Sequence, residues 1–167
     1  MTQMISNTPP AETMTIRDMS QDDFDTVVDI NQTALEGVGS LDREDLSLLV
    51  KQADQALVLD DEGDIAGFVI TLPTGATYDS SRYDWFEKRL DDYVYLDRIV
   101  VAQSHRRMGV ASRLYDEIEG DKPVALEVYD HNDASLAFHE GRGFEPVGEL
   151  EHNGTTNIMF VREPEAA

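Results

Sequence analysis

The chain has 167 residues, which suits a single domain and is long enough to bury a hydrophobic core. Its 34 acidic and 13 basic residues give a formal net charge of −21, and a surface this acidic repels nucleic-acid phosphates, so we expect no nucleic-acid partner. No apolar run approaches the roughly 20 residues of a membrane-spanning helix, and the lack of cysteine excludes disulfides and thiolate metal sites. Residues 1–12 do not resemble a secretory signal. We therefore expect a cytoplasmic protein without a membrane or metal partner.

The first part of the chain predicts a flexible polar leader over 1–13 and then a mixture of strands and helices. Ser20 followed by Asp23 resembles a capping box, so a helix should begin there. The apolar period then changes from about 3.6 to 2, which favours a hairpin closed by the turn at 61–64. The expected elements are, in order, strand 14–19, a helix from Ser20 to the glycines at 37 and 39, helix 42–53, and strands 55–60 and 65–72.

The second part of the chain begins with residues 73–92, which fit neither a strand nor a long helix, although 84–92 favours one or two helical turns. The elements expected after it are strand 93–102, helix 109–119, strand 123–129, helix 132–141, strands 144–150 and 155–161, and a flexible tail at 163–167. A strand, a helix and a second strand in succession predict a parallel pair with a right-handed crossover. We therefore predict one α/β domain over 14–162, α+β by some schemes, with helices on the faces of a sheet.

The segment HRRMGVASRL, residues 105–114, follows a predicted strand directly and opens a predicted helix. The free amide groups at such a helix start bind anions, and Gly109 and Ala111 leave the backbone accessible. Arg106 and Arg107 would add charge-assisted hydrogen bonds to a phosphate. The alternative is that the small residues only allow close helix packing and that both arginines are solvated. The segment lacks the residues of a P-loop and of a dinucleotide-binding GxGxxG turn.

Two motifs in this sequence resemble those of one enzyme superfamily. Residues 106–111, Arg-Arg-Met-Gly-Val-Ala, resemble the R/Q-x-x-G-x-G/A signature of the GNAT superfamily of acyl-CoA-dependent N-acetyltransferases. The segment 126–144 resembles its second signature, with Leu126, Glu127, Val128, Asn132, Gly143 and Phe144 in register. Together the motifs cover 93–148, and the DRIVVA strand and AFH helix resemble a subgroup of predicted acetyltransferases.

The resemblance implies a fold and a cofactor. The fold is a central mixed sheet of about six to seven strands flanked by helices, and acetyl-CoA lies in a cleft between the splayed parallel strands 93–102 and 123–129. The implied cofactor-binding residues are Ile99, Val100 and Val101 for the pantetheine arm, and Arg106, Arg107, Met108, Gly109, Val110, Ala111 and Ser112 for the pyrophosphate. Asn132 would hydrogen-bond the cofactor arm, although it is equally an ordinary helix N-cap. Phe138 would pack against the cofactor or the core.

The resemblance also suggests catalytic residues. Glu127 matches a proposed general base, but a strand glutamate can also form a structural ion pair, and Asp97 and Asp130 are competing candidates. His139 stands where many family members have a tyrosine that is proposed to protonate the departing thiolate. It could act as that acid, or it could be a partly buried helix histidine without a chemical role.

The resemblance implies that the first two helices and residues 73–92 form the wall of the acceptor site. Aromatic and acidic side chains in the second segment would hold an amine by charge and cation–π contact; they are Tyr78, Tyr83, Trp85, Phe86, Asp79, Asp84, Asp91 and Asp92. The alternative is a lid or a dimer surface, and a homodimer is frequent in the superfamily. The expected function is acetyl-CoA-dependent N-acetyl transfer to a primary amine of a small molecule or peptide terminus by direct attack. The alternative is a non-catalytic acyl-CoA-binding or regulatory protein.

Overall fold

A seven-stranded sheet organises the protein, with the strand order β1-β2-β3-β4-β5-β7-β6. The computed structural model describes residues 8–164. The strands are β1 (Thr15–Asp18), β2 (Gln55–Asp61), β3 (Asp64–Leu72), β4 (Val94–Val101), β5 (Val124–Tyr129), β6 (Glu145–His152) and β7 (Thr155–Arg162). Only β4 and β5 pair in parallel, and every other neighbouring pair is antiparallel. The predicted mixed sheet is therefore confirmed.

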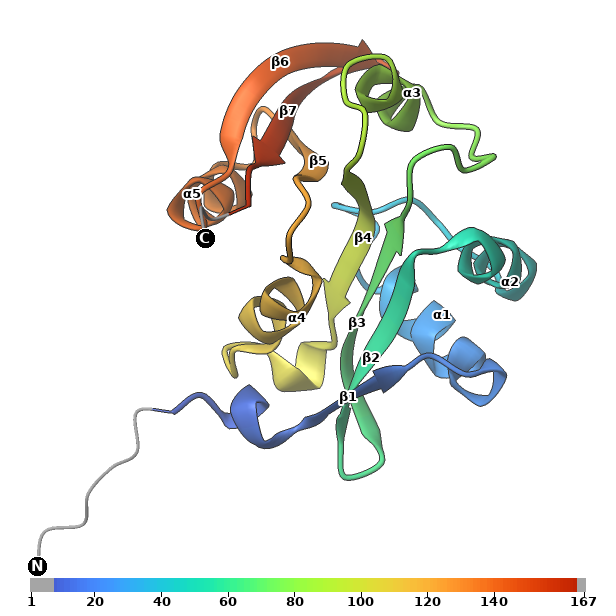
Figure 1. Ribbon diagram of the computed structural model, residues 1–167. Helices are drawn as coiled ribbons and strands as arrows, with labels where there is room; N and C mark the ends of the chain where they lie inside the picture. Colours follow the sequence, from blue (N-terminus) through green and yellow to red (C-terminus); the bar gives the residue numbers. More distant parts are fainter. Residues whose placement is uncertain (1–7, 165–167) are drawn as a thin grey trace, which may run out of the picture.

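Five α-helices cover the two faces of this sheet. They are α1 (Phe24–Gln32), α2 (Arg43–Gln52), α3 (Ser81–Glu87), α4 (Val110–Ile118) and α5 (Asp133–Gly141), and short 3-10 helices lie at η1 (Pro10–Thr13), η2 (Gln21–Asp23) and η3 (Gln103–His105). In Figure 1, α1 and α2 lie to one side of β2 and β3, and α4 lies to the other. None of the helices in the described part of the chain has the length and apolarity needed to cross a bilayer.

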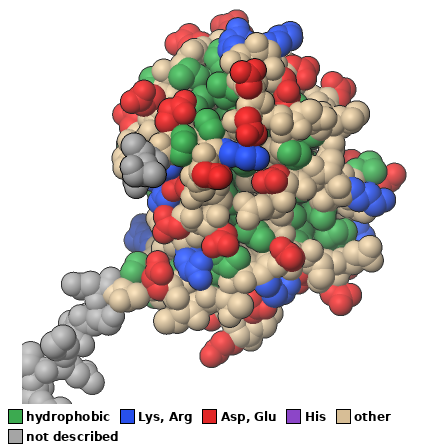
Figure 2. Space-filling view, in the orientation of Figure 1, with side chains coloured by type: hydrophobic (Ala, Val, Ile, Leu, Met, Phe, Trp, Pro, Cys, Tyr) green, Lys and Arg blue, Asp and Glu red, His purple; other side chains and the backbone are tan. Residues whose placement is uncertain are grey.

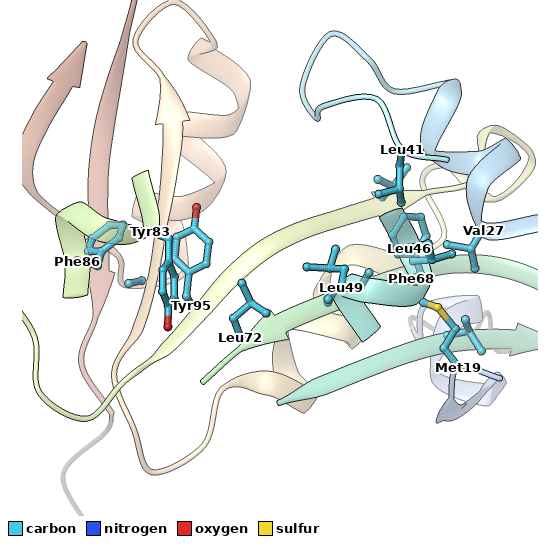
Figure 3. Close-up of a cluster of buried hydrophobic side chains, with 14 of the residues drawn as sticks. Met19, Val27, Leu41, Leu46, Leu49, Phe68, Leu72, Tyr83, Phe86 and Tyr95 are labelled. Atoms are coloured by element: carbon cyan, nitrogen blue, oxygen red, sulfur yellow. The ribbon is translucent and has the colours of Figure 1, made fainter. Parts of the chain in front are cut away.

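The core is divided by the sheet into two clusters, because successive strand residues point to opposite faces. Val58 belongs to the cluster under α1, α2 and α3, whereas Leu57 and Leu59 belong to the cluster under α4 and α5. Figure 3 shows the first cluster, in which the rings of Tyr83, Phe86 and Tyr95 gather at one end. These rings separate the hydrophobic interior from the polar floor of the site described below.

The loop between α1 and α2 is held over β4 by a buried polar network. Helix α1 ends at Gln32, earlier than the glycines at 37 and 39 that were predicted to end it. The buried Asn31 side chain donates to the Gly39 carbonyl at 3.0 Å, and Arg98 donates to both Asn31 Oδ1 and the Gly39 carbonyl at 3.0 Å. These bonds satisfy buried polar groups that the loop would otherwise leave unpaired, so residues 33–38 are positioned against β4.

Two of the predicted irregular segments contain helix. Residues 10–13, expected in the flexible leader, form η1, in which Ala11 is fully buried and its N–H donates to the Met108 carbonyl at 3.0 Å. Residues 1–7 of that leader and 165–167 of the predicted tail lie outside the described residues. Helix α3 begins at Ser81, before the 84–92 stretch that favoured helical turns, because Ser80 caps it and Tyr83 and Phe86 are buried.

Helix α4 rests closely on β3 at Gly67, which yields a prediction for stability. An added Cβ at Gly67 would lie 2.8 Å from both the Val100 carbonyl oxygen and Val110 Cγ1. Gly67→Ala should therefore lower the free energy of unfolding by about 1–3 kcal/mol, measured by urea denaturation. Gly120→Ala is the matched control, because no described atom lies within 4 Å of its added Cβ. Equal unfolding midpoints for the two variants would contradict this account.

Candidate functional site

The parallel strands β4 and β5 separate soon after they begin. They pair only at Val94 with Val124 and at Tyr95 with Ala125, although β4 continues to Val101 and β5 to Tyr129. The space between them opens into a cavity of about 480 Å³, called the cleft here. Its walls are the diverging ends of the two strands, the loop after α1 and the start of α5. The predicted splayed pair is therefore present.

The cleft brings together residues from both sequence motifs. Ile99, Val100 and Val101 line it from β4, with Arg106 just beyond them, while Glu127, Asn132 and His139 line it from β5 and α5. In the described chain, β4 forms no strand pairing with β5 beyond Tyr95, so its cleft-facing edge leaves backbone groups available. Asn132 also caps α5, because its side chain accepts a hydrogen bond from the Ser135 N–H at 3.1 Å.

The segment from Arg107 to Ser112 does not line the cleft itself but lies beyond its Arg106 end. Gly109 is the N-cap of α4 with a φ of 84°, and no side chain caps this helix. The first helical hydrogen bond runs from the Arg113 N–H to the Gly109 carbonyl, so the N–H groups of the first turn precede it. Val110 is buried, and only its backbone could contact a ligand. Met108 packs against the core, and its carbonyl accepts from Ala11.

Glu127 is a buried carboxylate on the floor of the cleft. Its side chain is 12% exposed. The Tyr95 hydroxyl donates to the carboxylate and lies 2.9 Å from Oε1 and 2.8 Å from Oε2. Arg82 Nη1 of α3 lies 3.9 Å from Glu127 Oε1. Burial raises the pKa of Glu127 from 4.5 to about 7, against the opposing effects of Arg82 and of the Tyr95 hydrogen bond. A carboxylate with this pKa can exchange protons near neutral pH.

The competing acidic candidates are placed differently. Asp97 lines the cleft, but Arg98 Nε pairs with it at 2.9 Å and the Tyr78 hydroxyl donates to it at 2.5 Å. Both carboxylate oxygens are therefore engaged, and Asp97 anchors Arg98 within the network that holds the loop after α1. The Asp130 side chain is 50% exposed, pairs with His131 and does not line the cleft. This geometry favours Glu127 over both of them as a base.

His139 lines the cleft but has no free N–H group. Its Nδ1 lies 2.7 Å from the Ser135 carbonyl, which can only accept, so Nδ1 carries the proton. Its Nε2 then accepts from the Tyr115 hydroxyl at 2.5 Å. Burial lowers the pKa of His139 below its usual value, which favours the neutral ring. The arrangement favours the buried helix histidine that the sequence left open. Phe138 is 36% exposed, lines no part of the cleft and packs on the ring of the core residue Tyr115, which agrees with the core alternative and not with a place against the cofactor.

The aromatic residues of 73–92 do not form the expected amine cage. Tyr83 and Phe86 are in the core, and Trp85 stacks under Arg89, whose guanidinium carbon lies 3.8 Å from the ring centroid. The Tyr78 hydroxyl is engaged in its hydrogen bond to Asp97. These rings are not free to form a cage because α3 packs its apolar side on the sheet, where burial of aromatic area is favourable. The side chain that this segment places near Glu127 is Arg82, which was not predicted from the sequence.

Two further cavities continue from the cleft. The first, of about 70 Å³, shares Glu127, Asn132 and Ser135 with the cleft and is called the inner cavity here. The second, of about 410 Å³, shares Arg82, Tyr129 and Asn157 with the inner cavity and is called the outer cavity. A continuous series of lining residues therefore leads from the cleft past Glu127 to the side of β5 and β7. No group of three or more His, Asp or Glu residues within 8–164 is arranged to hold a metal ion.

Comparison with known proteins agrees with this architecture. The model of the Acetyltransferase (GNAT) family matches residues 16–144, which is most of the chain. No curated protein sequence matches significantly.

Solved structures share the fold at low sequence identity. Chaetomium thermophilum Naa20 in complex with a bisubstrate analogue has a TM-score of 0.71 and 16% identity, over 90% of this chain and 86% of that one. Arabidopsis thaliana NAA60, also with a bisubstrate analogue, has a TM-score of 0.66 and 21% identity, over 89% of this chain and 97% of that one. Salmonella typhimurium yncA with its cofactor acetyl-CoA has a TM-score of 0.66 and 17% identity, over 93% of this chain and 96% of that one. The chain thus belongs to the acetyltransferase (GNAT) family, which uses acetyl-CoA.

Proposed function

We propose that the protein transfers the acetyl group of acetyl-CoA to a primary amine by direct attack of that amine. The observation that carries this proposal is Glu127, a buried carboxylate with a pKa of about 7 at the meeting point of the cleft and the inner cavity. The donor would enter from the cleft and the acceptor from the inner cavity. The acceptor is a small molecule or a peptide terminus.

The residues present fit acetyl-CoA. The unpaired edge of β4 at Ile99, Val100 and Val101 offers backbone groups to the amides of the pantetheine arm. The free amides at the start of α4 and the side chain of Arg106 suit the pyrophosphate, because a helix N-terminus and a guanidinium both favour anions. Asn132 lines the cleft from the start of α5 and could hydrogen-bond the pantetheine arm.

The chemistry then follows from the positions of the protein groups. Bound acetyl-CoA supplies a thioester carbonyl that an amine can attack. Glu127 would accept the proton that the amine loses, with Tyr95 orienting the carboxylate. A β4 amide near Ile99 or Val100 would donate to the developing negative charge on the carbonyl oxygen. His139 holds no free N–H, so we assign it no proton transfer and give it a positioning role in α5.

The anion site at α4 can be tested without disturbing the fold. Ser112 is exposed in the first turn of α4, where a glutamate stabilises a helix but repels a bound pyrophosphate. Ser112→Glu should raise the Kd for CoA by about tenfold or more, measured by calorimetry, while the melting temperature stays the same or rises. Ser112→Gln is the matched neutral control. An unchanged Kd in Ser112→Glu would place the pyrophosphate elsewhere.

The role of Glu127 can be tested through the pH dependence of activity. Thiol release from acetyl-CoA with an amine acceptor should show kcat/KM rising with pH through about 7, as Glu127 ionises. Glu127→Gln should lower kcat by about 10²–10⁴-fold and remove this rise. Asp130→Asn, outside the cleft, should keep the wild-type profile. Tight CoA binding without thiol release from any amine of a broad panel would support the non-catalytic alternative instead.

The burial of Glu127 also predicts an effect on stability. The folded protein binds the Glu127 proton more tightly than the unfolded chain, so its ionisation destabilises the fold as pH rises from 4.5 to about 7. The free energy of unfolding of Glu127→Gln relative to wild type should therefore increase by about 3 kcal/mol between pH 4 and pH 8, by urea denaturation. A pH-independent difference would show that Glu127 is not buried as described. Asp130→Asn serves as the control at an exposed carboxylate.

A further inference from the structure

The outer cavity differs from the rest of this acidic protein in its charge. Acidic side chains are scattered over the face of the molecule in Figure 2, consistent with the net charge of −21. The outer cavity, in contrast, has no Asp or Glu among its described lining residues, and its charged side chain is Arg82. In the inner cavity, Arg82 faces Glu127 across 3.9 Å. A cation in this position favours an anionic ligand in the outer cavity.

Arg82 has unused hydrogen-bonding capacity. A guanidinium carries five N–H groups, yet that of Arg82 forms no hydrogen bond to the described residues, since its ion pair with Glu127 is beyond hydrogen-bond distance. Its Nε is buried without a partner. A partly buried guanidinium left unpaired is unfavourable, and a ligand carboxylate would satisfy it through two parallel bonds.

Asn157, which lines the same cavities, carries a second unsatisfied group. It is 1% exposed on β7, directly across from Tyr129 of β5, and lines both the inner and the outer cavity. Its Nδ2 donates to the carbonyls of Leu150 and Thr155, which fixes the amide and leaves Oδ1 as a buried acceptor without a partner. An acceptor oxygen on a residue that lines the same cavity as a carboxylate suits the N–H groups of an amine.

We propose that the acceptor substrate is an α-amino acid, whose carboxylate is bound by Arg82 while its amine lies between Glu127 and Asn157. The proposal rests on the proposed function and specifies its substrate class. The spacing suits an α-amino acid: Arg82 Nη1 and Glu127 Oε1 are 3.9 Å apart, and the carboxylate and the amine of an α-amino acid are held close together on a single Cα atom. The side chain of the amino acid would occupy the outer cavity of about 410 Å³.

The test compares each amino acid with its amide, which keeps the amine and the side chain but lacks the carboxylate. Thiol release from acetyl-CoA is measured with a panel of such pairs. The wild-type protein should show kcat/KM at least about tenfold higher for the preferred amino acid than for its amide, because a charged hydrogen-bonded pair is lost in the amide. The carboxylate raises the pKa of the neighbouring amine, so amine ionisation alone would give the opposite preference.

Substitution of Arg82 supplies the second arm of the test. Arg82→Gln should reduce the ratio of kcat/KM for the amino acid to kcat/KM for its amide to near one, whatever the substitution does to the overall rate through Glu127. Arg82→Lys should retain part of the ratio, because an ammonium keeps the charge but not the planar fork. Arg89→Gln is the matched control, since Arg89 stacks on Trp85 outside these cavities and should keep the wild-type ratio.

The outcomes separate the two proposals. Thiol release with amines but with equal rates for amino acids and amides would overturn the assignment of the substrate class and leave N-acetyl transfer standing. A strong preference that survives in Arg82→Gln would overturn the role of Arg82. Absence of thiol release with every amine tested would reject the proposed function, and the substrate class with it.

Discussion

The separation of β4 from β5 is the constraint on which the rest of this structure depends. Parallel strands normally continue their hydrogen bonds to the end, and here pairing stops after Tyr95 and Ala125. The lost pairs leave an open strand edge beside α4 and bring Glu127 to the floor of a cleft instead of a covered sheet. The crossover through α4, which joins the two parallel strands, then places a helix N-terminus beyond the Arg106 end of that cleft. The proposed donor site, the position of Glu127 and the access from the side of β7 all depend on this divergence.

Burial raises the pKa of Glu127, and it also makes the ionised form of Glu127 destabilising to the fold. Tyr95 and Arg82 favour the ionised form, but they do not outweigh the desolvation of the carboxylate. The protein therefore holds a group that is poised near neutral pH at some expense of stability, a common property of functional sites. The aromatic cluster of Tyr83, Phe86 and Tyr95 maintains this environment, because its packed rings exclude water on the core side of the carboxylate.

Periodicity and two short motifs were sufficient to predict the order of the strands and helices along the chain and the parallel pair. They also predicted some of the residues that line the cleft, namely Ile99, Val100 and Val101 of β4 and Glu127 of β5. These features depend on local patterns, such as the alternation in β2 and the capping box of Ser20 and Asp23. Arg82 was not predicted, because its role depends on the contact of α3 with β5. Arg82 and Glu127 are 45 positions apart in the sequence. The docking of η1 and the engagement of both His139 nitrogens depend likewise on contacts between distant segments. Composition suggested aromatic residues for the acceptor site, but hydrophobic burial took those rings into the core.

The contact between η1 and the loop before α4 has a consequence for how the two ends of the molecule communicate. An added Cβ at Gly109 would lie 2.8 Å from Cβ of Pro9, and the neighbouring Met108 carbonyl is bound by Ala11. The absent side chain of Gly109 therefore accommodates the N-terminal segment as well as the φ of 84°. The N-terminal segment therefore packs against the same turn whose N–H groups form the proposed pyrophosphate site. Linkage is reciprocal, so if docking of the segment alters anion affinity there, anion binding alters the docking by the same free energy.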